Sequence, residues 1–172
     1  MKELKKDNYI NNIKELKAKQ TARKISKGVL IVSEISKIVI KGESGYCCVD
    51  EAYTDKVTVT GQSISYEYNP IFETEINPSR KWSYKTNSPG FKKLYADLAE
   101  VIPVIVNHDI DIFYTDIGKI EFIITYSDKT KLKKIFYIPG DEFKDCFQII
   151  KRMVPGCECI PRVLMTEDDY ED

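Results

Sequence analysis

Hydrophobic spacing predicts two helices of similar sequence. The stretch FKKLYADLAEVIP at 91–103 aligns without a gap over FKDCFQIIKRMVP at 143–155, and Phe, Lys and Pro are identical at their positions. Apolar residues recur in both stretches at intervals of three, four, seven, ten and eleven, which places them on one face of an α-helix. We therefore expect helices at 88–102 and 141–154.

The ends of these helices carry recognisable signals. Ser88 suits an N-cap, and Pro89 suits the first helical position because its missing N–H has no partner there in any case. Pro103 and Pro155 follow the last apolar residues of the two stretches. Because proline cannot continue a regular helix, we expect each helix to end there.

Alternation of apolar and polar residues predicts strands ahead of each helix. The alternating segments lie at 34–41, 57–60, 63–68, 81–86, 109–115, 120–126 and 131–138. Gly61-Gln62 predicts a two-residue type II′ hairpin turn, and other links between successive strands are also short. Strands joined by short turns must run antiparallel.

The combined pattern predicts an α+β fold with an internal duplication. Each unit is a three-strand meander followed by a helix (βββα), and the two units span about 55–103 and 109–155. They would form one antiparallel sheet with two helices packed on one face. Around the single domain at 28–165, we expect a basic amphipathic helix or arm at 1–27 and a disordered acidic tail at 166–172.

The second face of this sheet also carries apolar residues. Ile123 points away from Phe122 and Ile124, so the strand is apolar on both sides. We expect a protein partner or a second copy of the chain to cover this face, with the N-terminal helix as the alternative. Tyrosine suits a surface that is buried only part of the time. The candidate interaction residues are Tyr66, Tyr68, Trp82, Phe113, Ile123 and Tyr137.

Composition sets limits on partners and location. The formal net charge is −1, so no overall field attracts nucleic acid or a membrane. Charge is nevertheless uneven, with nine Lys/Arg in residues 1–27 and five acids in the last seven residues. No apolar segment has the length of a membrane span, and the start does not resemble a secretory signal. We therefore expect a cytoplasmic protein.

The cysteines and the single histidine are candidates for chemistry. Cys47, Cys48, Cys157 and Cys159 offer four thiolates for zinc, but neither pair has the usual C-x₂₋₄-C spacing, so we expect no metal or cofactor. His108 lies beside acidic residues and suits acid–base work. The fifth cysteine is Cys146, which we expect to be buried on the apolar face of the second helix.

The sequence favours a non-catalytic protein–protein interaction module, for example immunity- or inhibitor-like. Phosphate-binding glycine motifs do not occur, and nucleic acid is disfavoured because glutamates interleave with the strand tyrosines. The alternative is a small-ligand-binding or enzymatic domain that uses Cys47, Cys48 and His108. An apolar pocket near the Cys47–Cys48 loop would favour this alternative, whereas a flat aromatic patch would favour the interaction module.

Overall fold

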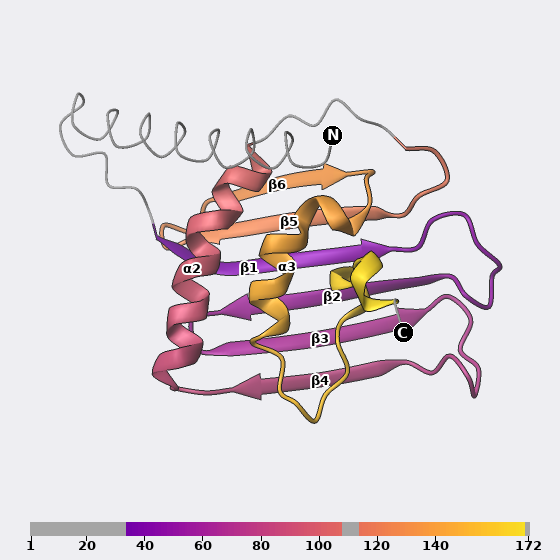
Figure 1. The fold of residues 1–172 in the computed structure, drawn as a ribbon, viewed down its shortest axis with the longest axis horizontal. Coiled ribbons are helices and arrows are strands. Elements are labelled where there is room, and N and C mark those ends of the chain that lie inside the picture. The colour runs from indigo at the N-terminus through magenta and orange to yellow at the C-terminus, as the bar shows by residue number, and fades with distance from the viewer. Residues whose placement is uncertain (1–33, 108–113, 171–172) are drawn as a thin grey trace. The chain divides into compact units, whose positions relative to one another are not determined.

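A computed structural model describes residues 34–107 and 114–170 (Figure 1). The chain divides into two units, Met1–Ser33 and Glu34–Asp172, and the description that follows concerns the second. The predicted N-terminal helix at 1–27, together with Phe113 and His108, lies outside the described residues.

Among the described residues, six strands form one sheet, and its antiparallel arrangement is as the sequence predicts. The strands are β1 (Ile35–Glu43), β2 (Tyr53–Thr60), β3 (Ser63–Pro70), β4 (Arg80–Lys85), β5 (Lys119–Tyr126) and β6 (Lys131–Phe136). Their order across the sheet is β4-β3-β2-β1-β5-β6, and every neighbouring pair is antiparallel. Strand β1 is central, because it pairs with β2 on one side and with β5 on the other.

Two helices and three short 3₁₀ turns lie over one face of this sheet (Figure 1). The helices are α2 (Pro89–Val106) and α3 (Lys144–Lys151), and the 3₁₀ turns are η1 (Gly140–Phe143), η2 (Arg162–Leu164) and η3 (Glu167–Asp169). The α+β class and the two predicted helical regions are therefore confirmed. Ser88 occupies the N-cap position of α2 with Pro89 next to it, although the Ser88 side chain makes no capping hydrogen bond.

The prediction that Pro103 ends the first helix is wrong. Helix α2 continues through Pro103 to Val106. A proline removes one backbone hydrogen bond, but the extra turn buries Ile105 and Val106 in the core. The side-chain amide of Asn107 then donates to the Pro103 carbonyl oxygen at 2.7 Å, which closes the C-terminal end.

The predicted hairpin between β2 and β3 has the right length but the wrong turn type. Thr60 pairs with Ser63, so the link is the two residues Gly61 and Gln62. A type II′ turn needs a positive φ at its first residue, and among the described glycines none has one. By contrast, the β5–β6 turn uses Lys129 at φ 69°, where a non-glycine residue is uncommon.

The core lies between the sheet and the helices. Alternate residues of the strands point toward the helices, and Ile38, Ile40, Val57 and Val59 are fully buried there. At the β5–β6 side, four phenylalanine rings form a cluster with centroids 5.1–6.4 Å apart: Phe122, Phe136, Phe143 and Phe147. Burial of one such side chain stabilises the fold by roughly 1.5–3 kcal/mol.

The internal duplication is not confirmed. Its first unit corresponds to β2, β3, β4 and α2, but the first strand of the second unit was expected at 109–115. Residues 109–113 of that segment lie outside the described residues, and Tyr114 and Thr115 are not in a strand. Strand β5 pairs instead with β1, which belongs to neither predicted unit.

The described part of the acidic tail makes contacts with α3. Thr166 and Asp169 form a capping box at η3, which satisfies the backbone at both positions. Lys151 and Lys144 form ion pairs with Asp169 and Asp168 at 2.5 Å. Lysines of α3 thus lie beside two acids of the tail and offset their charge.

Candidate interaction surface

Three connecting segments meet at one end of the sheet. They are the β1–β2 loop (44–52), the β3–β4 loop (71–79) and the segment that leads into β5 (114–118). Backbone hydrogen bonds join them: Ile71 N–H donates to Ala52 O at 2.7 Å, and Tyr46 N–H donates to Asp116 O at 3.1 Å. We call these three segments the loop end.

Glycines permit the close approach between two of these segments. A Cβ atom at Gly45 would clash with the backbone of Asp116, and one at Gly118 would clash with the Glu43 carbonyl oxygen. Asp116 itself has φ 63°, a left-handed conformation that aspartate tolerates better than most residues. The sequence therefore fixes the 114–118 segment against the β1–β2 loop.

The β3–β4 loop is anchored to the sheet by side chains. The Tyr68 hydroxyl donates to Asn77 Oδ1 at 2.7 Å, and Asn77 Nδ2 donates to the Asp50 carbonyl oxygen at 2.9 Å. The Glu73 carboxylate accepts hydrogen bonds from the Ser79 N–H at 2.9 Å and from its hydroxyl at 2.7 Å. These contacts hold both loops in one conformation relative to the strands.

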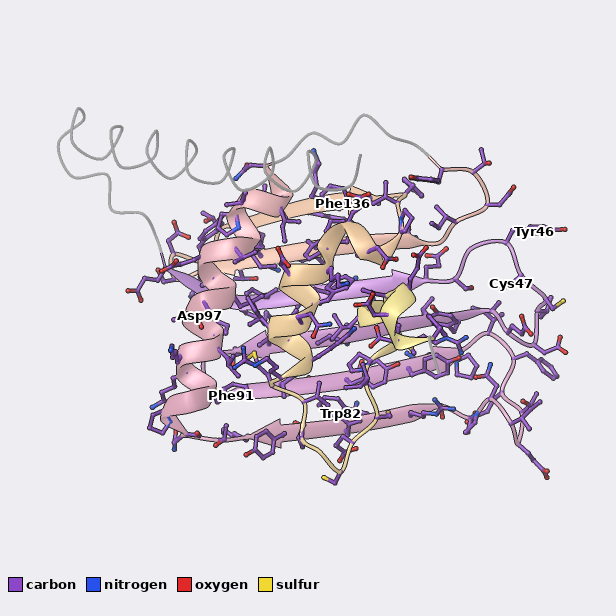
Figure 2. The ribbon with its side chains drawn as sticks, viewed as in Figure 1. Tyr46, Cys47, Trp82, Phe91, Asp97 and Phe136 are labelled. Carbon is purple, nitrogen blue, oxygen red and sulfur yellow. The ribbon has the colours of Figure 1, made fainter. Side chains whose placement is uncertain are left out.

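Large apolar side chains project from these anchored loops into solvent. The exposed fractions are 91% for Tyr46, 63% for Val49, 64% for Ile71, 60% for Phe72 and 91% for Ile76. Among the other large apolar residues that the structure describes, only Tyr170 is as exposed. Figure 2 shows Tyr46 and Cys47 beyond the strand ends and directed away from the sheet. The exposed apolar surface is therefore concentrated at the loop end.

The loop end is also acidic. Its charged residues are Asp50, Glu51, Glu73, Glu75 and Asp116, and the segments 44–52, 71–79 and 114–118 contain no Lys or Arg. Five negative charges thus surround the exposed apolar side chains. A surface of this kind is electrostatically complementary to a basic one.

The sheet face opposite the helices has a different character. We call it the open face, because no helix of residues 34–107 or 114–170 lies over it (Figure 1). The strand registers place these charged residues on it: Lys37, Lys41, Glu43, Lys56, Glu67, Lys81, Lys85, Lys119, Glu121, Lys131 and Lys133. Eight lysines against three glutamates give this described surface an excess of five positive charges.

Ion pairs cross the open face from strand to strand. Glu67 pairs with Lys56 at 2.5 Å and with Lys81 at 3.0 Å. Glu121 pairs with Lys41 at 3.4 Å and also with Lys133. Hydrogen bonds from Lys56 and Lys81 lower the pKa of Glu67 below its ordinary value. Glu67 and Glu121 therefore remain negatively charged, and each lies between two lysines.

Asp55 is buried on the helix side of the sheet. Its carboxylate accepts a hydrogen bond from the Val163 N–H at 2.8 Å, and the nearby Tyr66 hydroxyl accepts one from the Arg162 N–H at 3.2 Å. Burial raises the pKa of Asp55 to about 6, although hydrogen bonds to the carboxylate from the Val163 backbone and the Tyr66 side chain partly oppose the rise. Asp55 and Tyr66 thus fasten η2 to β2 and β3.

The six predicted interaction residues do not share one surface. Tyr66, Tyr68 and Trp82 are buried on the helix side, with 2%, 1% and 8% of their surface exposed. Ile123 and Tyr137 lie on or beside the open face, and Phe113 lies outside the described residues. The alternation in SISYEY correctly put the tyrosines on one side, but it could not say that helices cover that side.

The structure does not bring the four candidate zinc thiolates together. Cys47 and Cys48 are exposed at the loop end, and Cys157 and Cys159 are exposed after α3. Among the described residues, no group of three or more potential ligands could hold a metal ion. Cys146 is buried as expected, and burial raises the pKa of its thiol, so it is poorly reactive.

A groove of about 390 Å³ lies between the start of α2 and the end of α3. Tyr84, Phe91 and Leu94 line one part of it, and Arg152 and Pro155 contribute to another. Its position is at the opposite end of the sheet from Cys47 and Cys48 (Figure 2). It is therefore not the pocket that the alternative function at the Cys47–Cys48 loop requires.

Comparison with protein families and with curated proteins gives no information about function. No protein-family model matches the chain, and no curated protein matches it. None of the helices within the described ranges has the length and apolar character needed to cross a membrane.

Sequence reasoning missed the apolar residues of the loop end. Val49 lies in a loop without clear periodicity, and the sequence predicts a short extended piece at 71–76, so neither segment is assigned to a face. A usable signal was present, because the Asn-Pro pairs at 69–70 and 77–78 mark the apolar segment between them as a loop. Apolar residues in a loop have no core to enter and are candidates for binding.

Proposed function

We propose that this protein is a non-catalytic protein–protein interaction module that binds a basic protein surface through its loop end. The observation that supports the proposal is the set of five exposed apolar side chains on two anchored, acidic loops. An immunity- or inhibitor-like protein needs only such a shaped surface. The proposal keeps the cytoplasmic location expected from the sequence.

The two properties of the loop end have separate roles in binding. Tyr46, Phe72 and Ile76 supply the affinity, because removal of apolar surface from water contributes about 25 cal/mol for each Å² buried. The surrounding carboxylates supply specificity and a faster association, because opposite charges steer the partner during encounter. Anchored loops also lose little conformational entropy on binding.

The chemistry favours protein over other partners. Nucleic acid binding depends on neutralisation of phosphates by Lys and Arg, and the three segments of the loop end contain neither. Anionic membranes attract basic segments for the same reason, so five carboxylates oppose adsorption to them. A basic protein surface satisfies both the charge and the exposed apolar area.

One of the buried candidate residues acts through the loops. Tyr68 holds Asn77 by its hydroxyl and stacks against Tyr53 with ring centroids 5.2 Å apart. Tyr66 instead packs against Trp82 in the middle of β3 and β4. We assign Tyr68 a positioning role, since it fixes the conformation from which Phe72 and Ile76 project.

A photoreactive amino acid at position 72 tests the proposal. It would be introduced in place of Phe72 in the full chain and activated in cells that naturally contain the protein. We expect a covalent adduct with a protein whose contact surface is basic. The matched control places the same amino acid at Lys93, an exposed position on α2. No adduct from position 72, or equal adducts from both positions, would contradict the proposal.

Charge reversal tests the electrostatic part. The double variant Glu51→Lys/Glu75→Lys should lower the adduct yield by about tenfold or more, because rim charges control association. The control Asp97→Lys/Glu158→Lys changes the net charge equally at exposed sites away from the loop end. An equal loss in both double variants would mean that only overall charge matters.

A further inference from the structure

The open face presents a second surface, and its charge is opposite to that of the loop end. The loop end carries five acids and no base, whereas the open face carries eight lysines and three glutamates. The whole chain has a net charge of only −1, so the asymmetry is visible only when the strand registers are known. Each surface therefore fits a different kind of partner.

Three lysines of the open face have no ion-pair partner among the described residues. Lys37 and Lys131 both lie beside Thr125, on β1 and β6, and Lys85 lies beside Ser63 at the other edge of the sheet. All three lie at the same end of the face, which is opposite to the loop end. Hydroxyl groups of Thr60, Ser63 and Thr125 lie between them. This end offers ammonium groups without an ion-pair partner in 34–107 and 114–170, on a hydroxyl-lined support.

We propose that the open face binds an acidic segment of another protein, with carboxylates placed against Lys37, Lys85 and Lys131. The ion pairs around Glu67 and Glu121 form the central band of the contact. Positive and negative side chains alternate across the strands in this band. This alternation restricts which acidic sequences fit, because a misplaced carboxylate would be repelled by Glu67 or Glu121.

Other parts of this chain suit the open face less well. Residues 1–27 carry nine Lys/Arg and three acids, so their charge has the same sign as the face. A second copy placed face to face would oppose two positive surfaces. Asp168 and Asp169 of η3 are already paired with Lys144 and Lys151 of α3, on the other side of the sheet.

A nucleic acid is also less suited to this face. Glu67 and Glu121 would stand against phosphates at its centre. Single-stranded nucleic acid further needs aromatic rings on which successive bases stack. The open-face positions of the six described strands hold no aromatic residue, and Tyr137 lies just beyond the end of β6.

Titration of the full chain with two labelled polyanions tests the inference. One probe is a short poly-glutamate peptide, and the other is an oligothymidylate of equal charge. The variant Lys37→Gln/Lys85→Gln/Lys131→Gln should weaken peptide binding about tenfold at about 0.15 M salt. The control Lys92→Gln/Lys93→Gln/Arg152→Gln removes the same charge from exposed positions on the helix side and should leave binding unchanged. Any contribution of residues 1–27 is common to both variants.

Three results would overturn the inference. Equal losses in the two triple variants would show an effect of net charge alone, and no loss in either would show that the face does not bind. Tighter binding of the oligothymidylate, lost only in the open-face variant, would make the face a nucleic-acid surface. The open-face variant should still form the adduct from position 72, which separates this inference from the proposed function.

Discussion

Phenylalanines under the helices and at the loop end have the same chemistry but opposite environments. Phe122 is fully buried and touches three other rings, whereas Phe72 is 60% exposed on an anchored loop. Burial of the apolar Phe122 side chain stabilises the fold, and this accounts for an apolar residue at that position. Nothing within the described part of the chain covers Phe72, so its apolar character points to a contact outside that part.

Substitution of Phe122 by alanine should give the largest effect. It removes the ring at the centre of the phenylalanine cluster and leaves a cavity, which costs about 3–5 kcal/mol of unfolding free energy. Urea denaturation of the full chain measures this value. A loss below about 1 kcal/mol would mean that the cluster is not a packed core, and the contrast with Phe72 would disappear.

Asp55 should make stability depend on pH. Its pKa of about 6 in the fold lies above the ordinary value of 3.8, so the folded state binds the proton more tightly than the unfolded state. Its contribution is therefore present at low pH and is lost as pH rises through 6. From pH 4 to pH 7 it decreases by about 2 kcal/mol.

The variant Asp55→Asn isolates this effect. Other carboxylates, such as Glu67 and Asp169 with their lowered pKa values, titrate equally in both proteins and cancel in the difference. The stability of Asp55→Asn relative to the unaltered chain should therefore rise by about 2 kcal/mol between pH 4 and pH 7. A difference that does not change with pH would show that Asp55 is not buried beneath η2.

Glu67→Gln should have a small effect on stability. The Glu67 side chain retains 32% of its surface exposed, so water and salt screen its pairs with Lys56 and Lys81. We expect a loss below about 1 kcal/mol that disappears in concentrated salt. Chemical denaturation at two salt concentrations checks it. A larger, salt-independent loss would mean that the open face is buried against something else.

Much of the fold followed from the sequence because its signals are local. Helical spacing at 91–102 and alternation at 63–68 depend on neighbours along the chain, and both were confirmed. The end of α2 was missed because burial of Ile105 and Val106, a tertiary effect, outweighed the local preference of Pro103.

The candidate surfaces depend on contacts between distant segments. Lys37, Lys85 and Lys131 share one end of the open face only through the pairing of β1 with β5 and the order of the other strands. Similarly, Tyr46 and Phe72 share the loop end because Ile71 bonds to Ala52. Alternation assigns a residue to one side of a strand, but it does not show which side the helices cover. The sequence alone therefore cannot tell whether Tyr66 and Tyr68 belong to the buried core or to an exposed binding surface.

The most direct test measures unfolding and partner binding in one variant, Tyr46→Ser/Phe72→Ser/Ile76→Ser, with a photoreactive amino acid in place of Val49. Because these side chains contact mainly solvent, the unfolding free energy should change by less than about 0.5 kcal/mol. The adduct that position 49 forms in the otherwise unaltered chain should be lost. A variant that loses several kcal/mol yet keeps the adduct would contradict the account, because the loop end would then belong to the core rather than to an interface.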